Sequence, residues 1–139
     1  MILLDTGGLL AVIDAGQPRH HTAGVTLDAD EGPFVVSPFV LCELDYLVTS
    51  RLGTATELEL LDDVAHGAYE LAQFDAPDVA SARAVVEQYR DLSIGLADAS
   101  IVVLAGRYAT NRVLTFDERH FRALRTPQGD PFVVLPADA

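Results

Sequence analysis

Short apolar segments separated by long helical stretches constrain the fold of this 139-residue chain more than any other feature. Antiparallel neighbours need only short turns, whereas strands that are separated by helices pair in parallel. Because the apolar runs are continuous rather than alternating with polar residues, we expect strands that are buried on both faces. The pattern predicts a single domain, residues 1–139, with an α/β fold: a three-layer α/β/α sandwich whose parallel sheet has about five strands.

The predicted elements cover the whole chain. The strands are expected at residues 1–4, 34–36, 69–74, 112–115 and 132–135. The helices are expected at residues 6–14, 18 to about 28, 38 to about 53, 54 to about 67, 77 to about 91, 96–108 and 118–124. Several helix starts are marked by residues that typically cap a helix, namely Ser37 before Pro38, the pair Thr54 and Glu57, and Asp75.

Composition limits the class of protein. Twenty-one acids and nine bases give a net charge of −12, and all nine bases are arginines. This charge argues against a nucleic-acid binder, although five arginines gather between residues 107 and 125. The single cysteine, Cys42, excludes a disulfide framework within one chain, is typical of a reducing cytoplasm, and is interpreted as a small buried apolar residue. The longest stretch without charge, residues 32–42, is too short to span a bilayer, so we expect a cytoplasmic protein without membrane contact.

Four acids stand at unusual places in this pattern. Asp5 and Asp117 follow predicted strands, and ligands of such folds bind at the carboxyl ends of the strands. Glu43 and Asp98 share helical spacing with apolar residues, which predicts that both face inward. Structural alternatives exist for each one. Asp5 and Asp117 could cap helices, Glu43 could reach solvent or pair with an arginine, and the helix dipole favours Asp98 in a first turn.

Four carboxylates in one cleft repel each other unless a cation joins them. Mg²⁺ and Mn²⁺ prefer oxygen ligands, and a metal held in this way activates a water and stabilises charge on a phosphate oxygen. The cluster therefore predicts phosphodiester chemistry. The histidines have no metal-ligand spacing and are interpreted as surface or turn residues, with the last of them a candidate for RNA contact: His20, His21, His66 and His120.

Four segments, taken in order, resemble a known family. They are MILLDTG at residues 1–7, VSPFVLCEL at 36–44, IGLADA at 94–99 and LTFDERHF at 114–121. Together they resemble the PIN domain, and more narrowly the VapC toxin ribonucleases of bacterial VapBC toxin–antitoxin pairs. The resemblance covers essentially the whole chain, and it implies a PIN-like three-layer fold.

The resemblance also implies an activity and a site. The catalytic residues, which would hold one or two Mg²⁺ (or Mn²⁺) ions, are Asp5, Glu43, Asp98 and Asp117. Thr6 and Thr115 would support these acids or position the substrate. The implied activity is that of a divalent-metal-dependent endoribonuclease, which cleaves structured RNA (tRNA or rRNA) with a metal-activated water and leaves a 5′-phosphate and a 3′-hydroxyl. The implied partners are RNA, a VapB-like antitoxin that often inserts an arginine among the acids, and a second copy in a homodimer.

Alternatives remain open at this point. Three arginines are candidates for contact with RNA phosphates, or for a solvated or antitoxin-facing surface: Arg112, Arg119 and Arg122. Asp45 and Asp91 have no assigned role. A non-catalytic PIN-fold protein-interaction module is the alternative function.

Two other enzyme classes share part of the N-terminal pattern. The segment LLDTG at residues 3–7 also occurs in aspartic proteases, but those enzymes are all-β. Phosphatases that form an aspartyl phosphate resemble Asp-x-Asp, whereas position 7 is glycine here, and the chain has no lysine. We set both classes aside.

Overall fold

The computed structural model describes all 139 residues and confirms the α/β prediction. One parallel sheet has the order β3-β2-β1-β4-β5, formed by β1 (Ile2–Leu4), β2 (Phe34–Val36), β3 (Glu70–Leu71), β4 (Arg112–Leu114) and β5 (Val133–Leu135). Leu4 of the central strand is level with Val36 of β2 and with Leu114 of β4. The carboxyl ends of these three strands therefore lie together at one edge of the sheet.

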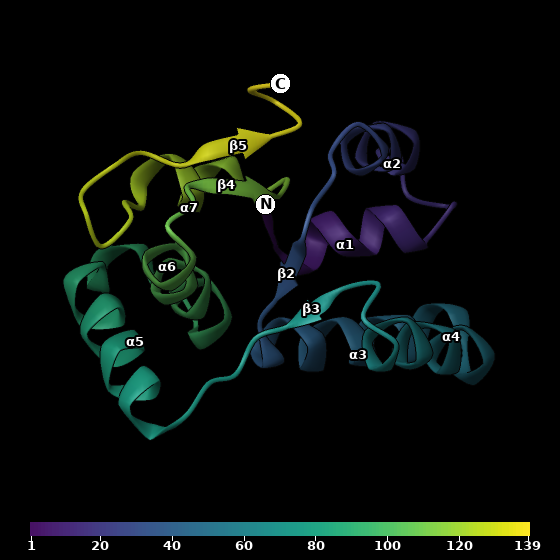
Figure 1. Ribbon diagram of the computed structural model, residues 1–139, viewed down its shortest axis with the longest axis horizontal. Helices are drawn as coiled ribbons and strands as arrows, with labels where there is room; N and C mark the ends of the chain where they lie inside the picture. The colour runs from purple at the N-terminus through teal and green to yellow at the C-terminus, as the bar shows by residue number, and fades with distance from the viewer.

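Seven α-helices cover the two faces of the sheet. They are α1 (Thr6–Ile13), α2 (His20–Asp28), α3 (Pro38–Leu52), α4 (Thr54–Ala65), α5 (Ala76–Gln88), α6 (Leu96–Tyr108) and α7 (Glu118–Ala123). The chain moves outward from β1 to β3 and then crosses to the other side of β1. Because parallel crossovers are right-handed, α1–α4 lie on one face and α5–α7 on the other, as Figure 1 shows. None of the helices has the length and apolar content needed to cross a membrane.

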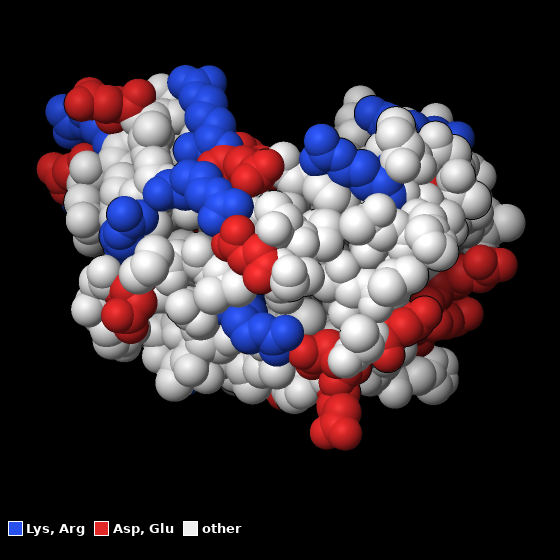
Figure 2. Space-filling view, turned by 90° about the horizontal axis from the view of Figure 1, so that it is seen from above, with Lys and Arg blue, Asp and Glu red and all other residues white.

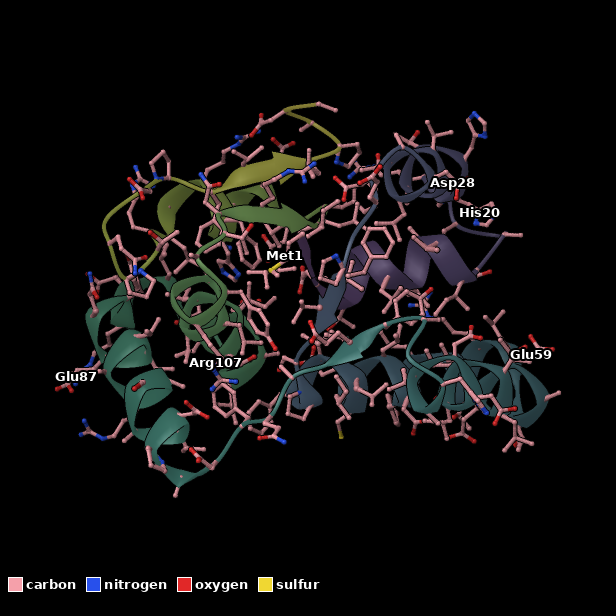
Figure 3. The ribbon with its side chains drawn as sticks, viewed as in Figure 1. Met1, His20, Asp28, Glu59, Glu87 and Arg107 are labelled. Carbon is pink, nitrogen blue, oxygen red and sulfur yellow. The ribbon has the colours of Figure 1, made fainter.

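The core lies on both faces of this sheet. All three residues of β1 are buried, and β2, β4 and β5 bury two residues each, which confirms the expected burial of the strands. The strand β3 is different, because it lies at an edge of the sheet and both of its residues are exposed. On the α5–α7 face, Arg107 of α6, labelled in Figure 3, pairs with Asp78 near the start of α5, with 2.6 Å between the nitrogen and the oxygen.

Several local predictions were wrong in detail. The second helix begins at His20 and not at Pro18, and the strand expected over residues 69–74 has only two residues. Thr54 is the first residue of α4 rather than its cap, because Gly53 takes the cap position at φ 89°. Cys42 is exposed, since it lies half a turn from the buried Val40 on α3.

The fifth helix was predicted with the right cap but the wrong end. Asp75 caps α5 in a capping box with Asp78. The helix ends at Gln88, and a single 3₁₀ turn over Arg90–Leu92 follows it.

Candidate active site

The sheet topology places a crevice at the carboxyl end of the central strand. The strands β2 and β4 flank β1, and the helices that lead to them cover opposite faces. Ligands of open α/β sheets bind at such a switch point. A cleft of about 470 Å³ lies there, and it is lined by Asp5, Thr6, Gly7, Glu43, Gly95, Ala97, Asp98, Phe116, Asp117 and His120. All four acids that were singled out from the sequence therefore meet in one cleft.

Asp5 is the most deeply buried of these acids, with 8% of its surface exposed. Its Oδ1 accepts a hydrogen bond from the backbone N–H of Thr6 at 2.8 Å, so it caps α1. Its Oδ2 accepts one from the hydroxyl of Thr115 at 2.6 Å. Burial raises the pKa of Asp5 in spite of both bonds, and the charges of Asp117 and Glu43 raise it further. Capping and a place in the cleft are thus combined in one side chain.

Glu43 of α3 lines the cleft but is exposed, so the prediction that it faces inward was wrong. The buried stripe of α3 includes Val40 and Leu44. At 100° per residue Glu43 lies beside this stripe rather than on it. The hydroxyl of Thr6 donates a hydrogen bond to Oε2 of Glu43 at 2.9 Å, which holds the carboxylate at the rim of the cleft.

Asp98 lies in the first turn of α6 and is half-buried. Burial raises its pKa to about 6, and the charges of Asp5, Asp117 and Glu43 act in the same direction. His120 acts in the opposite direction because a positive imidazolium favours the carboxylate. The raised pKa thus has burial as its main cause, and the convergence of the acids adds to it.

Asp117 and His120 stand at the start of α7. The Oδ1 of Asp117 accepts a hydrogen bond from the backbone N–H of His120 at 3.1 Å and caps the helix. The backbone N–H of Asp117 donates to Thr115 Oγ1 at 3.0 Å, so Thr115 links Asp117 to Asp5. The Nδ1 of His120 lies 2.9 Å from Asp117 Oδ2 and 3.3 Å from Asp98 Oδ2. That nitrogen is buried and makes no well-aligned hydrogen bond.

Sequence reasoning did not place His120 among the acids. The signal that could have found it is its spacing, because a residue three positions after a helix cap lies on the same side of the first turn as that cap. Its proximity to Asp98 depends on how α6 and α7 pack, and no local pattern contains that information.

This set of donors fits a divalent cation. The carboxylate oxygens of Asp98 and Asp117 and a ring nitrogen of His120 lie within 4.8 Å of one another. Asp5 and Glu43 line the same cleft. A bound cation would offset the repulsion among the acids, and the unpartnered nitrogen of His120 could serve as one of its ligands.

Two buried serines hold the helices of the site together. The hydroxyl of Ser100 in α6 donates to the carbonyl oxygen of Ala97 at 2.6 Å, so the hydroxyl of Ser37 donates to Ser100 Oγ at 2.7 Å. Ser37 Oγ in turn accepts from the backbone N–H of Phe39 at 3.1 Å and caps α3. This chain of bonds fixes the start of α3 against the start of α6. It therefore holds the helix that bears Glu43 in place against the helix that bears Asp98.

A family model described as the PIN domain matches residues 2–126, which is most of the chain. The chain belongs to the PIN-domain family. This PIN domain is 46% identical to Ribonuclease VapC26 of Mycobacterium tuberculosis (strain ATCC 25618 / H37Rv) over 135 residues, which are 97% of this chain and the whole of that protein.

Solved structures agree with this assignment of the fold. The crystal structure of Mycobacterium tuberculosis VapC20, described as a sarcin-ricin loop cleaving toxin, superposes with a TM-score of 0.79 at 19% identity and covers 85% of this chain and 91% of its own. VapBC2 from Rickettsia felis, solved with a DNA fragment from its promoter, gives a TM-score of 0.63 at 23% identity and covers 96% of this chain and 97% of its own. At these identities the two structures show that the fold is shared.

The three candidate arginines of the PIN domain do not form one surface. Arg112 begins β4, at the edge of the sheet opposite the cleft, and pairs with Asp30 at 2.7 Å. The sequence already indicated that Arg112 lies away from the cleft, because it stands at the start of a predicted strand and the cleft lies at the carboxyl ends. Arg122 is held by Glu118 and Asp138 at 2.9 and 2.7 Å. Arg119 is exposed and makes no ion pair.

The two unassigned acids also lie outside the cleft. Asp45 of α3 lies near Glu57 of α4, and this neighbouring carboxyl group raises the pKa of Asp45. Asp91 is exposed in the 3₁₀ turn after α5. Neither residue lines the cleft, and we assign neither to the site.

Proposed function

We propose that this PIN domain is a divalent-metal-dependent endoribonuclease and the toxin of a VapBC-type toxin–antitoxin pair. The observation that supports it most directly is the convergence of Asp5, Glu43, Asp98 and Asp117 in one cleft at the carboxyl edge of the sheet. The chain that bears this cleft is 46% identical to Ribonuclease VapC26 over the whole length of VapC26. VapC20, which has the same fold, is described as a toxin that cleaves the sarcin-ricin loop.

The four acids are proposed to hold one or two Mg²⁺ or Mn²⁺ ions, with the ring nitrogen of His120 beside them. When bound, such an ion lowers the pKa of a water and stabilises negative charge on a phosphate oxygen. Without the ion, keeping these acids ionised in the cleft costs free energy of folding, as the raised pKa values of Asp5 and Asp98 indicate. We therefore expect ion binding to release protons at pH values around or below the Asp98 pKa of about 6.

The surrounding hydroxyls orient the acids before substrate arrives. Thr115 fixes Oδ2 of Asp5 and the backbone of Asp117 with one oxygen atom. Thr6 fixes Glu43 at the rim. Because these side chains are already held, less conformational entropy is lost when the ion and the RNA bind. Thr6 and Thr115 are therefore proposed as supporting residues rather than as reacting groups.

We propose three partners for this chain. The first is structured RNA, and the second is an antitoxin, since the similar structures include VapBC and FitAB complexes. An antitoxin arginine placed among the four acids would be attracted by their charge. The third is a second copy of the chain in a homodimer.

The test is cleavage of total cellular RNA by the purified protein with Mg²⁺ or Mn²⁺, and again with a chelator. Asp98→Asn is expected to lower the rate more than about a hundredfold, because it removes one of the acids proposed to hold the ion. Asp62→Asn, at an exposed position of α4, is the matched control and is expected to cleave normally. Cleavage that persists in chelator, or in a folded Asp98→Asn variant, would contradict the assignment. Absence of cleavage by a protein that binds the metal would favour the non-catalytic interaction module.

A further inference from the structure

A second pocket of about 300 Å³ adjoins the catalytic cleft. It is lined by Arg19, Thr22, Thr115, Phe116, Glu118, Pro136 and Ala137. Thr115 and Phe116 also belong to the catalytic site, since Phe116 lines the acidic cleft and Thr115 binds Asp5. Phe116 therefore lines both spaces, and the second pocket meets the catalytic cleft at this residue.

Arg19 is the cationic side chain of this pocket. Its guanidinium carbon lies 4.7 Å from the centroid of the Phe116 ring. A guanidinium that stacks on an aromatic face keeps its N–H donors free at its edges. Six of the nine arginines make ion pairs with carboxylates or hydrogen bonds to backbone carbonyls within the chain: Arg83, Arg90, Arg107, Arg112, Arg122 and Arg125. Arg19 makes no such bond, so its donors are available to a ligand.

The other polar groups of the pocket also suit an anion. The Thr22 hydroxyl makes no hydrogen bond within the chain and adds a free donor. Glu118 is the one acid in the lining, and Arg122 pairs with it at 2.9 Å and offsets its charge. Figure 2 shows arginine side chains on both sides of a hollow in the face seen from above, with acidic side chains next to some of them. In a chain with a net charge of −12, such a place is where a polyanion can be held.

We propose that the Arg19–Phe116 pocket binds a phosphate of the RNA strand next to the phosphodiester that is cleaved, with Arg19 as the positioning residue. This inference rests on the proposed ribonuclease function. The stacked guanidinium binds the phosphate through two N–H donors, and the contact fixes the register of the strand over the acidic cleft. It also adds local attraction for RNA to a protein with a net charge of −12.

The first experiment measures RNA binding in the Asp98→Asn background, which keeps the RNA uncut. The probe is a labelled RNA oligonucleotide that spans a cleavage site mapped in total cellular RNA, titrated at several salt concentrations. Arg19→Ala is expected to weaken binding about tenfold and to lower the slope of log K against log[salt] by about 0.7, because one phosphate contact is lost. Arg19→Lys keeps the charge and the slope but loses the stacked, bidentate geometry.

Arg51→Ala is the matched control. Arg51 is exposed in the last turn of α3, two turns beyond Glu43, and it makes no ion pair. Its replacement changes the net charge as Arg19→Ala does, and it is expected to leave the salt slope unchanged. A merely structural role of Arg19 would not change that slope.

The second experiment locates the phosphate. Each linkage of the same oligonucleotide is replaced in turn by an uncharged methylphosphonate, and cleavage by the wild-type protein and by Arg19→Ala is compared. Substitution of one linkage beside the scissile one is expected to lower the cleavage rate of the wild type about tenfold. The same substitution is expected to leave the cleavage rate of Arg19→Ala unchanged.

Two results would overturn the proposal, and they are distinguishable. If the wild type cleaves while Arg19→Ala binds and cleaves like Arg51→Ala, the assignment of the pocket as a phosphate subsite is refuted. A contact with a protein partner then becomes the remaining role for the pocket. If the wild type shows no metal-dependent cleavage of RNA, the proposed function itself fails, and the subsite fails with it.

Discussion

Replacement of Asp98 by asparagine is expected to stabilise the metal-free protein at neutral pH. Burial and the neighbouring acids raise the pKa of Asp98 from 3.8 to about 6. The folded state therefore binds a proton more tightly than the unfolded chain does, so stability falls as pH rises from about 4 to about 6 and stays low above that range. A shift of about two units corresponds to about 3 kcal/mol. Because only 18% of the side chain is exposed, solvent screens little of this penalty.

Asparagine has nearly the same shape and remains neutral, so Asp98→Asn removes the penalty. A gain of about 3 kcal/mol corresponds to a rise in Tm of roughly 10 °C for a chain of this length. The assay is urea unfolding in the presence of chelator at pH 4 and at pH 7.5, with Asp62→Asn as the control. The gain is expected at pH 7.5 and is expected to be small at pH 4, where the wild-type carboxyl is largely protonated.

The divalent ion should reverse the order of stability. Mg²⁺ binds the folded wild type and stabilises it by mass action, and it binds the variant less well. If Asp98→Asn lowers stability equally at both pH values in chelator, the Asp98 carboxylate makes favourable contacts in the folded state, and the argument from acid repulsion is refuted.

Three further sets of changes test the packing around the site and the residues proposed to hold the ion. Gly8→Ala is expected to destabilise the fold by roughly 1–3 kcal/mol in urea unfolding, because its Cβ would overlap the Leu114 carbonyl, whereas Gly7→Ala has open space and should stabilise α1 by about 0.5–1 kcal/mol. Ser100→Ala is expected to cost about 1–3 kcal/mol because it leaves the buried Ser37 hydroxyl without an acceptor, and the double variant with Ser37→Ala should cost less than the sum of the two single changes. His120→Ala is expected to weaken binding of Mg²⁺ or Mn²⁺ about tenfold by calorimetry, with His66→Ala as an exposed control.

Each of these three has an outcome that would contradict it. Equal effects of the two glycine changes would mean that α1 does not approach β4 as closely as the structure shows. Additive effects of the two serine changes would remove their hydrogen bond as the link between α3 and α6. Unchanged ion binding by His120→Ala would mean that the acids hold the ion without His120.

The number, kind and order of the elements were predictable because they depend on local patterns. Helices α3 and α6 begin where the sequence predicts, and the short apolar runs around β1, β2, β4 and β5 pair in parallel. Asp5 and Asp117 were placed correctly for the same reason: an acid that follows a strand within a few residues lies near its carboxyl end whatever the rest of the fold is.

The environment of individual side chains was less predictable. Spacing along α3 gives the direction of Glu43 around the helix axis but not the distance to the next element, and the residue is exposed at the rim of the cleft. Cys42 is a different case: it was predicted to be buried and is exposed, and its spacing along α3, half a turn from Val40, already indicates the exposed side of the helix.

The sequence by itself determined the parallel α/β sheet and the edge at which the acids gather, because strand and helix periodicity and the direction of the chain are local properties. Only the tertiary structure decided that His120 joins Asp98 and Asp117, and that Arg19 stacks on Phe116. Asp98 and His120 belong to different helices, and Arg19 and Phe116 lie far apart in the chain. Their contact depends on how helices of fixed direction pack across the end of the sheet, and that depends on the shape and volume of the whole core.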